Sequence, residues 1–333
     1  MQRFKSIFRH SIAAAAVAGL MGSALLAPPA AAAEKVRVAL GDVVSVETLA
    51  FLVALERAKD RGIDYEMTSF AKEELAIQSI VNGQADLGVG TPYSVIQKSK
   101  VPLKVIFQMS RLVFFPVASV EYKTWKDLDG QPFTFHARGS GTEAMGNIIA
   151  RRQGIEFGQR SYIPGSENRV VAMLNGQIKG TILDLPNMKL LMARGGDRFH
   201  VLPGVSEVPS DELIFASDDW IANNAEAANV VVEELLKLWS EMKENPAIVE
   251  EERAKRNLLA DQPKEILEEV VPFYTEGAKE GLFDPAGGGT EAAKADFVFY
   301  TEAGQMEGPA ESLKVEEFWN LEPLNAAKQK LGL

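Results

Sequence analysis

The sequence predicts an α/β protein with two lobes, each a mainly parallel sheet flanked by helices. Strand-like and helix-like segments alternate through the first two thirds of the chain, an order typical of parallel sheets. The length of 333 residues is enough for two domains. A third observation is an internal similarity between AIQSIVNGQADLGVGTPYSVI (residues 76–96) and RVVAMLNGQIKGTILDLPNMKLL (residues 169–191). This repeat favours two lobes built on one plan over a chance recurrence of helix caps.

The elements follow in a regular order along the chain. In the first third, strands are predicted at residues 35–40, 65–70, 85–89 and 103–109, with helices at 46–59, at 73–81 and from Thr91-Pro92 onward. The middle third has predicted strands at 131–137, 160–163, 181–184 and 201–202, with helices at 142–153, 168–174 and 186–193. After Ser217 the pattern is helical, with amphipathic runs at 225–244, 246–259 and 263–277. The segment DPAGGGT at 284–290 is predicted to be a flexible loop, because it follows no strand and no glycine-lysine pair follows it.

Both repeated blocks contain matching cap residues. Each helix ends at Asn-Gly, and we expect Gly83 and Gly176 to adopt positive φ as helix C-caps. Thr91 before Pro92 is predicted to be an N-cap with proline at the first helical position.

The N-terminus is typical of an exported protein. Arg3, Lys5 and Arg9 precede an apolar run at residues 12–27, and small residues follow at 30–33. This order predicts a secretory signal peptide over residues 1–33, with cleavage near Ala33. The run is shorter than the roughly 20 residues that span a bilayer, so we expect a periplasmic protein without a membrane anchor.

Composition narrows the classes of partner and site. The chain has no cysteine, which excludes a lipid-modified cysteine, a disulfide framework and thiolate metal ligands. Removing residues 1–33 leaves 46 acidic residues and 32 basic residues, a net charge of −14. Such a charge argues against nucleic acid or anionic lipid as a partner. It does not exclude a small anionic ligand, which a local group of donors can bind.

Four loops are candidates for ligand contact because they follow predicted parallel strands. Ligands of open α/β sheets bind beyond the carboxyl ends of the strands. The loops are Gly41-Asp42-Val43 and Thr91-Pro92-Tyr93 in the first lobe, and residues 138–142 and Asp184-Leu185-Pro186 in the second. If the lobes face one another, all four border a single cleft.

The segment HARGSGTE, which begins at His136, predicts an anion site. It contains a strand end, a glycine-rich turn and a helix start, where free N–H groups and the helix dipole favour negative charge. Ser140 or Thr142 caps the helix, Gly139 and Gly141 shape the turn, and Arg138 adds a guanidinium suited to a carboxylate or sulfonate. Glu143 leaves two interpretations open: it satisfies the helix N-terminus itself, or it selects a ligand with a cation or a donor. His136 is either a ligand contact or a histidine packed at a strand end.

Several enzyme classes lack their reacting groups in this sequence. It contains no HExxH, G-x-S-x-G or Walker lysine motif. Gly139, Gly141 and Ala144 have the G-x-G-x-x-A spacing of dinucleotide-binding turns, but Pro164-Gly165-Ser166 stands where that fold needs an acidic residue. We therefore expect no enzyme activity, no cofactor and no metal site.

The order of motifs resembles a known family. NGQADLGVGTPYS, WKDLDGQPF, GSGTE, a second NGQ block and the ending VEEFWNLEPLNAAKQKLG occur in sequence. The whole mature chain resembles the solute-binding proteins of ABC importers, in the group that binds sulfonates, taurine, nitrate and thiamine-pyrimidine precursors. The resemblance implies the type II periplasmic binding fold, in which two lobes joined by two crossing strands close on a ligand.

The resemblance also implies an organisation and a site. Lobe 1 comprises residues 34–112 and 213–333, lobe 2 comprises residues 113–212, and the crossings lie near 112–119 and 208–217. Asp42, Thr91 and Tyr93 face the ligand from lobe 1, and Ser140, Gly141, Thr142 and Asp184 face it from lobe 2. The expected ligand is a small organic anion, a sulfonate or carboxylate, and the expected partner is a membrane permease that receives it from a monomeric receptor.

The sequence leaves alternatives open for the transporter class, the ligand and some site residues. GSGTE also resembles the TAXI-type receptors of TRAP transporters, although the segment after the first strand does not match their glycine- and tyrosine-rich opening. A pyrimidine or thiamine precursor is an alternative ligand, whereas the cysteine-rich motif of the related pyrimidine synthases is missing. Arg111 is an alternative to Arg138 as the anion-binding cation. Phe115, with Phe114 and Tyr93, forms either an aromatic wall of the site or part of the core.

Overall fold

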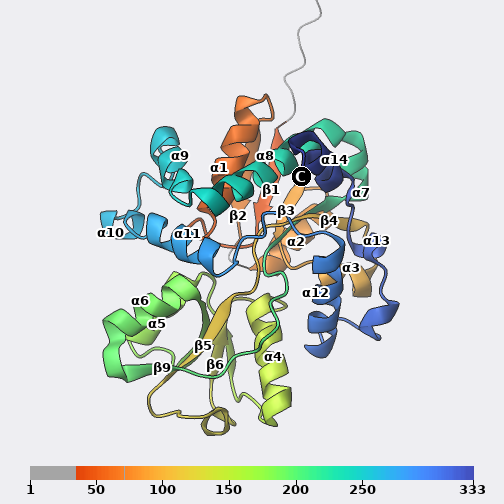
Figure 1. Cartoon of the computed structure of the whole chain (residues 1–333). Helices are drawn as coiled ribbons and strands as arrows, with labels where there is room; N and C mark the ends of the chain where they lie inside the picture. Colours follow the sequence, from red (N-terminus) through yellow and green to blue (C-terminus); the bar gives the residue numbers. More distant parts are fainter. Residues whose placement is uncertain (1–34, 71) are drawn as a thin grey trace, which may run out of the picture. The chain divides into compact units, whose positions relative to one another are not determined.

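The computed structural model describes residues 35–333 except residue 71, and it contains two five-stranded sheets with helices packed around each (Figure 1). This arrangement confirms the predicted fold class. The predicted signal peptide lies outside the described residues. Among the described residues, no helix combines the length and the hydropathy needed to cross a membrane.

The first sheet has the strand order β2-β1-β3-β10-β4. Its strands are β1 (Val36–Leu40), β2 (Tyr65–Ser69), β3 (Leu87–Gly90), β4 (Leu103–Gln108) and β10 (Leu213–Ser217). β1 is parallel to β2 and β3, whereas β10 is antiparallel to both β3 and β4. Parallel strands require crossover connections, and β1, β2, β3 and β4 are joined in turn by α1 (Leu49–Asp60), α2 (Glu73–Val81) and α3 (Tyr93–Ser99).

The second sheet repeats this order as β7-β6-β8-β5-β9. Its strands are β5 (Phe114–Ser119), β6 (Phe133–Phe135), β7 (Arg160–Tyr162), β8 (Gly180–Asp184) and β9 (Phe199–Val201). β6 is parallel to β7 and β8, and β5 is antiparallel to β8 and β9. The antiparallel strand therefore occupies the same position in both sheets.

The two connections between the sheets pair with each other. Arg111 and Ser210 form an isolated antiparallel bridge, and the Leu112 N–H donates to the Pro209 carbonyl at 2.8 Å. The crossings predicted at 112–119 and 208–217 thus contain strands β5 and β10 as well as the connections. The predicted lobe boundaries stay a prediction, because residues 34–333 form one compact unit.

The internal repeat corresponds to one structural unit in each half. The segments α2-β3-α3 and α5-β8-α6, where α5 is Ser166–Leu174 and α6 is Leu185–Gly195, have the same element order. Gly83 and Gly176 have the predicted positive φ, 67° and 71°, and each follows the asparagine that is the C-cap of its helix. The predicted Thr91 cap is wrong: α3 begins at Tyr93 with Pro92 as N-cap, and the Thr91 hydroxyl donates instead to the Asp211 carbonyl at 3.0 Å.

The remaining helices lie in the second sheet's half and in the C-terminal third. They are α4 (Gly141–Gln153), α7 (Asp218–Asn223), α8 (Ala225–Glu244), α9 (Ile248–Arg256), α10 (Lys264–Leu267), α11 (Val270–Lys279), α12 (Thr290–Glu302), α13 (Val315–Phe318) and α14 (Glu322–Leu331). Short 3₁₀ turns lie at Trp125–Leu128, Gly196–Arg198 and Ala310–Ser312. The helix predicted at 263–277 is divided into α10 and α11.

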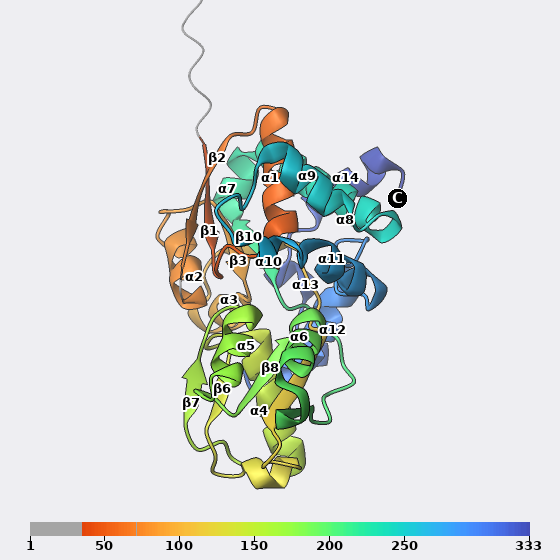
Figure 2. The ribbon, with the colours of Figure 1, turned by 90° about the vertical axis from the view of Figure 1, so that its left-hand side faces the viewer.

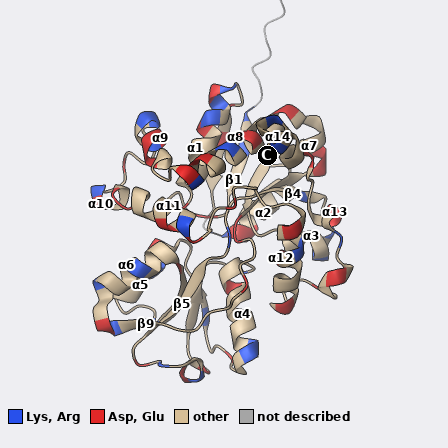
Figure 3. Cartoon of the chain, in the orientation of Figure 1, with Lys and Arg blue, Asp and Glu red and all other residues tan. Residues whose placement is uncertain are grey.

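C-terminal helices complete the core around the first sheet. Trp239 of α8 is 1% exposed, packs edge-on against Phe107 of β4 and donates to the Met109 carbonyl at 3.0 Å. Arg57 of α1 pairs with Glu241 at 2.8 Å and Glu252 at 3.1 Å, so one cation connects α1, α8 and α9. Figure 3 shows acidic and basic residues interspersed on these outer helices.

Candidate functional site

Loops from the two sheets meet where their parallel strands end. Gly165, after β7, lies against Val43, after β1: a Cβ on this glycine would be 3.1 Å from Val43 Cγ2. Gly141, at the start of α4, lies against Asp211, which precedes β10. A Cβ on this glycine would be 2.5 Å from Asp211 Oδ1. The side chains after β1, β6 and β7 and before β10 are therefore neighbours, although they come from distant parts of the sequence.

A pocket of about 350 Å³ lies between these loops and helices of both halves. Val43 and Glu47 line it from the first sheet's half, and Glu167 lines it from α5. The other lining residues are Val44, Ser45, Val46, Asn168, Val171, Pro186, Asn187, Leu190, Gln262, Ile266, Glu269 and Phe273. Beside the pocket, α6 contacts α11 (Figure 2). Lys189 of α6 forms an ion pair with Glu276 of α11. We call this the strand-end pocket.

Four buried carboxylates lie at the base of these loops and form what we call the acidic cluster. They are Asp42, Glu73, Asp211 and Glu212, which are 2%, 2%, 8% and 7% exposed. Burial raises the pKa of Asp42 to about 6, that of Asp211 to about 7 and that of Glu73 to about 8. Burial and the neighbouring carboxylates raise the pKa of Glu212 well above its usual range. Charged carboxylates are thus costly here unless a cation compensates them.

Two more carboxylates in the strand-end pocket share this environment. Burial raises the pKa of Glu167 to about 7, with Asp42 and Asp184 adding repulsion. The pKa of Glu47 is also raised, by burial and by repulsion from Asp184 and Asp42. The cost of negative charge in the acidic cluster therefore extends to the pocket wall.

Arg169 is the single buried Lys or Arg of residues 35–333, residue 71 aside. Its guanidinium donates to the Ile182 and Ile163 carbonyls at 3.2 and 2.9 Å and to Ser166 Oγ at 2.8 Å. These bonds hold α5 against β7 and β8. Arg169 thus compensates part of the negative charge, but its nitrogens already have protein partners.

His136 lies beside Asp42 and Glu212 at the end of β6. One donor atom from each of these three side chains lies within 4.8 Å of the others, a spacing compatible with a divalent metal ion. His136 Nδ1, however, accepts from the Gly165 N–H at 3.4 Å, which puts the proton of the neutral ring on Nε2. A metal-bound histidine instead donates its second ring N–H to an acceptor. The Gly165 N–H therefore disfavours a metal ion bound at Nε2.

The ring of His136 is neutral. Burial and the positive charge of Arg169 lower the pKa of His136 to about 3, although the Gly41 backbone favours the charged ring. His136 Nε2 lies 3.9 Å from Asp42 Oδ1, too far for a hydrogen bond.

The glycine turn binds an anion that belongs to the chain itself. Ser140 Oγ caps α4 by accepting from the Glu143 N–H. The Glu143 carboxylate accepts from the Gly139 N–H at 2.7 Å and from the Tyr162 hydroxyl at 2.6 Å. Of the two interpretations of Glu143, the geometry supports the one in which it satisfies the helix N-terminus.

The two candidate arginines have contacts outside the acidic cluster. Arg138 is exposed, and its guanidinium lies 5.2 Å from the centre of the Tyr162 ring. Arg111 lies in the outbound connection and donates to the Gly281 carbonyl at 3.5 Å. Phe115 is partly exposed on β5.

Other residues that were predicted to contact the ligand are instead bound to groups of the protein or buried in it. Tyr93 is 1% exposed; its hydroxyl donates to Asp296 at 2.6 Å and accepts from Trp319 Nε1 at 2.8 Å, inside the C-terminal aromatic core. Asp184 caps α6 by accepting from the Asn187 N–H and side-chain amide at 2.9 and 2.8 Å. Thr142 Oγ1 accepts from the His136 N–H, and Pro92 is buried at the start of α3. Among the residues predicted from the sequence, Asp42, His136, Thr91 and Gly141 lie in or beside the acidic cluster. Val43 and Pro186 line the strand-end pocket.

Sequence reasoning missed Glu73, Asp211, Glu212, Glu167 and Arg169. A signal for Asp211 and Glu212 was present, because they directly precede a strand on the predicted return crossing. An antiparallel strand begins at the edge where its parallel neighbours end, so residues before β10 lie beside those after β1 and β3. Glu73 and Arg169 lie on helices, and their inward orientation had no sequence signal.

The sequence also matches a known family. A family profile described as NMT1/THI5 like matches residues 47–248, a range that includes every strand of both sheets except β1. The chain belongs to the NMT1/THI5-like family. This confirms the resemblance inferred from the order of motifs. A search of curated proteins gave no match.

Solved structures similar to this NMT1/THI5-like protein have the periplasmic binding protein fold. A protein from Bordetella bronchiseptica RB50 is 18% identical, with a TM-score of 0.72 over 90% of this chain and 98% of that chain. The periplasmic nitrate-binding protein NrtA from Synechocystis PCC 6803 is 13% identical, with a TM-score of 0.65 over 89% of each chain. A putative periplasmic sulfonate-binding protein, SsuA from Methylobacillus flagellatus KT, is 17% identical, with a TM-score of 0.59 over 90% of this chain and 95% of that chain. At these identities the similarity establishes the fold.

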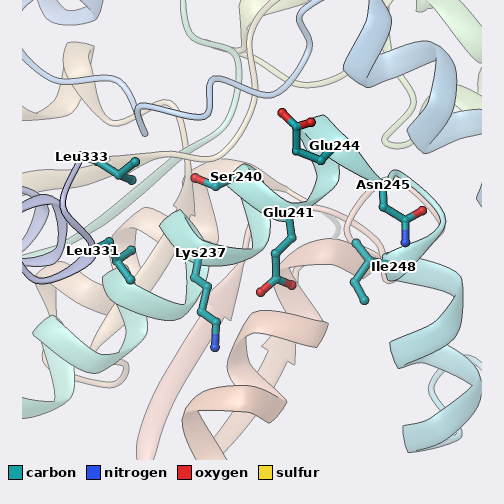
Figure 4. Close-up of a pocket in the computed structure, with 8 residues that line it drawn as sticks. All are labelled: Lys237, Ser240, Glu241, Glu244, Asn245, Ile248, Leu331 and Leu333. Atoms are coloured by element: carbon teal, nitrogen blue, oxygen red, sulfur yellow. The ribbon is translucent and has the colours of Figure 1, made fainter.

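A different pocket lies on the outside of the first sheet's half. It has a volume of about 500 Å³ and is formed by α8, Asn245, the start of α9 and the C-terminal residues (Figure 4). Glu241 in its wall is paired with Arg57. None of its residues lies on a loop that follows a strand, so it is separate from the strand-end pocket.

Proposed function

We propose that this NMT1/THI5-like protein is an extracytoplasmic receptor that binds a small solute between its two sheets and delivers it to an ABC importer. The observation that carries the proposal is the meeting of strand-end loops from both sheets around buried polar groups, beside a pocket of about 350 Å³. The nitrate- and sulfonate-binding proteins with the same fold support it by analogy. A TAXI-type receptor of a TRAP transporter is not favoured by the family match.

The proposed mechanism is a population shift. A solute that contacts both halves only when they are close together stabilises that arrangement by its differential affinity. Pairs such as Lys189 with Glu276, which join α6 to α11 at the pocket, would form part of the closed shape that a permease recognises. Family and fold point to a receptor rather than an enzyme.

The organic anion expected from the sequence has little support from this geometry. Glu143 occupies the glycine turn, Arg138 lies over Tyr162, and Arg169 is engaged by protein acceptors. An anion is therefore the alternative that the ligand screen has to test.

The test is a thermal-shift screen of the mature protein with sulfonates, carboxylates, nitrate, pyrimidines and amines. A true ligand at about 100 times its dissociation constant adds about 2.7 kcal/mol to the free energy of unfolding. Hydrogen exchange with the best solute should show protection at residues 41–47, 136–142, 163–167 and 209–212. Protection confined to residues 237–248, at the outer pocket of Figure 4, would contradict the proposed site.

A further inference from the structure

Two carboxylates and an imidazole from three separate segments meet between the sheets. Asp42 follows β1, His136 follows β6 and Glu212 precedes β10. Each is more than nine-tenths buried, and one donor atom of each lies within 4.8 Å of the others. Both halves of the protein therefore contribute to one small polar site.

Glu212 has a buried oxygen with no protein partner. Its Oε2 and the Oε2 of Glu73 are both buried without a hydrogen bond. Buried acceptors are almost always paired in folded proteins, and leaving one unpaired costs about 1–3 kcal/mol or more when the group is charged. The unpaired Oε2 of Glu212 therefore indicates a donor that is supplied from outside the chain.

Acidic side chains outnumber basic ones around this site. Glu73, Asp211 and Glu47 all repel a negative charge on Glu212. Arg169 is the single buried cation of residues 35–333, residue 71 aside, and its nitrogens donate to Ile182, Ile163 and Ser166. The neutral ring of His136 adds no positive charge.

We propose that the solute is an organic cation whose positive nitrogen lies between the carboxylates of Asp42 and Glu212. This rests on the proposed receptor function and names its substrate class. Two oxygens no more than 4.8 Å apart can both accept from one ammonium or amidinium group at about 2.8 Å. His136 lies on the Asp42 side, with its Nε2 3.9 Å from Asp42 Oδ1.

The rest of the solute would lie in the strand-end pocket, whose lining residue Val43 directly follows Asp42. Val171, Leu190 and Phe273 give it an apolar wall, and Glu47 and Glu167 add two carboxyl groups. An organic body fits such a wall, whereas a bare metal ion needs no apolar surface. The Gly165 N–H at His136 Nδ1 also favours an organic cation over a metal ion.

The test uses probes of one shape and three charges: benzamidine, benzamide and benzoate, followed by aliphatic amine, alcohol and carboxylate sets of equal length. Thermal shift and calorimetry should rank the cation first in a set, with at least a tenfold tighter dissociation constant than its anion. Zinc chloride alone is a separate arm. Stabilisation by zinc without any organic cation, or a preference for neutral or anionic members, overturns the proposal.

Glu212→Gln and Asp42→Asn test the site itself. Each should weaken cation binding at least tenfold, because the cation loses one of its two carboxylate partners. Neither should lower the melting temperature of the ligand-free protein, because each removes one buried acidic group that its acidic neighbours make costly to ionise. A folding defect would lower both affinity and melting temperature, so the two effects are distinguishable. Glu121→Gln, which removes an exposed partner of Lys179, is the matched control and should change neither.

The two proposals fail in different ways. If the protein binds anions selectively and the strand-end loops are protected, the organic-cation proposal is overturned but the receptor proposal is not. No stabilisation by any member of the sets, together with no protection of those loops, would remove both.

Discussion

The Glu143 side chain decides what the glycine turn before α4 does. Its carboxylate receives the Gly139 N–H at 2.7 Å and the Tyr162 hydroxyl at 2.6 Å, and Arg160 lies 3.6 Å away. The positive end of the helix dipole is therefore compensated within the chain. The glycine turn, which attracts anions, is thus stabilised by the carboxylate of Glu143, four residues after Gly139.

Glu143→Ala should lower the free energy of unfolding by about 1.5–3 kcal/mol, because two charge-assisted hydrogen bonds to partly buried partners are lost. Urea denaturation followed by circular dichroism measures this directly. Glu121→Ala, at an exposed ion pair with Lys179, should stay within about 0.5 kcal/mol. Equal stability of the two variants would show that Glu143 is not the anchor of this turn.

At the scale of elements, the second sheet's half depends on the close approach of α4 to β6. Gly146 in the middle of α4 faces Phe135 of β6, and a Cβ on this glycine would lie 2.3 Å from the ring. A larger residue at this position would separate α4 from β6, the strand that His136 directly follows. A glycine inside a helix is normally unfavourable, so its presence here is explained by packing.

Gly146→Ala should destabilise the protein by about 1–3 kcal/mol through overpacking, although Gly→Ala in a helix usually stabilises by up to about 1 kcal/mol. Thermal unfolding of the variant measures the sign as well as the size of the effect. Gln153→Ala, at an exposed position of the same helix, should change stability by less than about 0.5 kcal/mol. A stabilised Gly146→Ala variant would mean that the helix shifts freely on β6.

At the scale of the whole molecule, the buried carboxylates couple stability to pH. Burial raises the pKa of Glu73 to about 8 and the pKa values of Asp211 and Glu167 to about 7. Between the ordinary carboxylate pKa and these values, the folded state binds more protons than the unfolded state, so stability falls as pH rises. His136 acts in the opposite sense, but only between its lowered pKa of about 3 and its ordinary value of 6.5.

Above pH 6.5 the carboxylates act alone, so the ligand-free protein should become less stable from pH 6.5 to about pH 8. Melting temperature measured across this range at constant ionic strength tests the prediction. Glu73→Gln removes one of the titrating groups and should make the decline smaller. A melting temperature that rises or stays constant over this range would contradict the raised pKa values.

The sequence alone predicts the features that depend on local pattern. Alternating strands and helices, the Asn-Gly caps at Gly83 and Gly176 and the repeat of 76–96 at 169–191 all lie within short windows, where hydrogen bonding and hydrophobic period act. The rule that ligands bind beyond strand ends also led to Asp42 and His136, since that rule needs only the position of each strand end.

Side-chain direction required the tertiary structure. Tyr93 follows a strand as predicted, but Asp296 and Trp319, more than 200 residues later, bind its hydroxyl inside the core. Glu212 lies beside Asp42 only because β10 returns to the first sheet as an antiparallel strand.

Charge at the site is likewise a tertiary property. Its local sequence alone makes the turn at Gly139 attractive to anions. The acidic cluster beside this turn is buried, and it is assembled from segments as far as 170 residues apart. Burial is what raises the cost of those charges, and no window of the sequence specifies burial. The sequence therefore determined the scaffold and the edge at which a solute would bind, and the tertiary structure decided which charges face it.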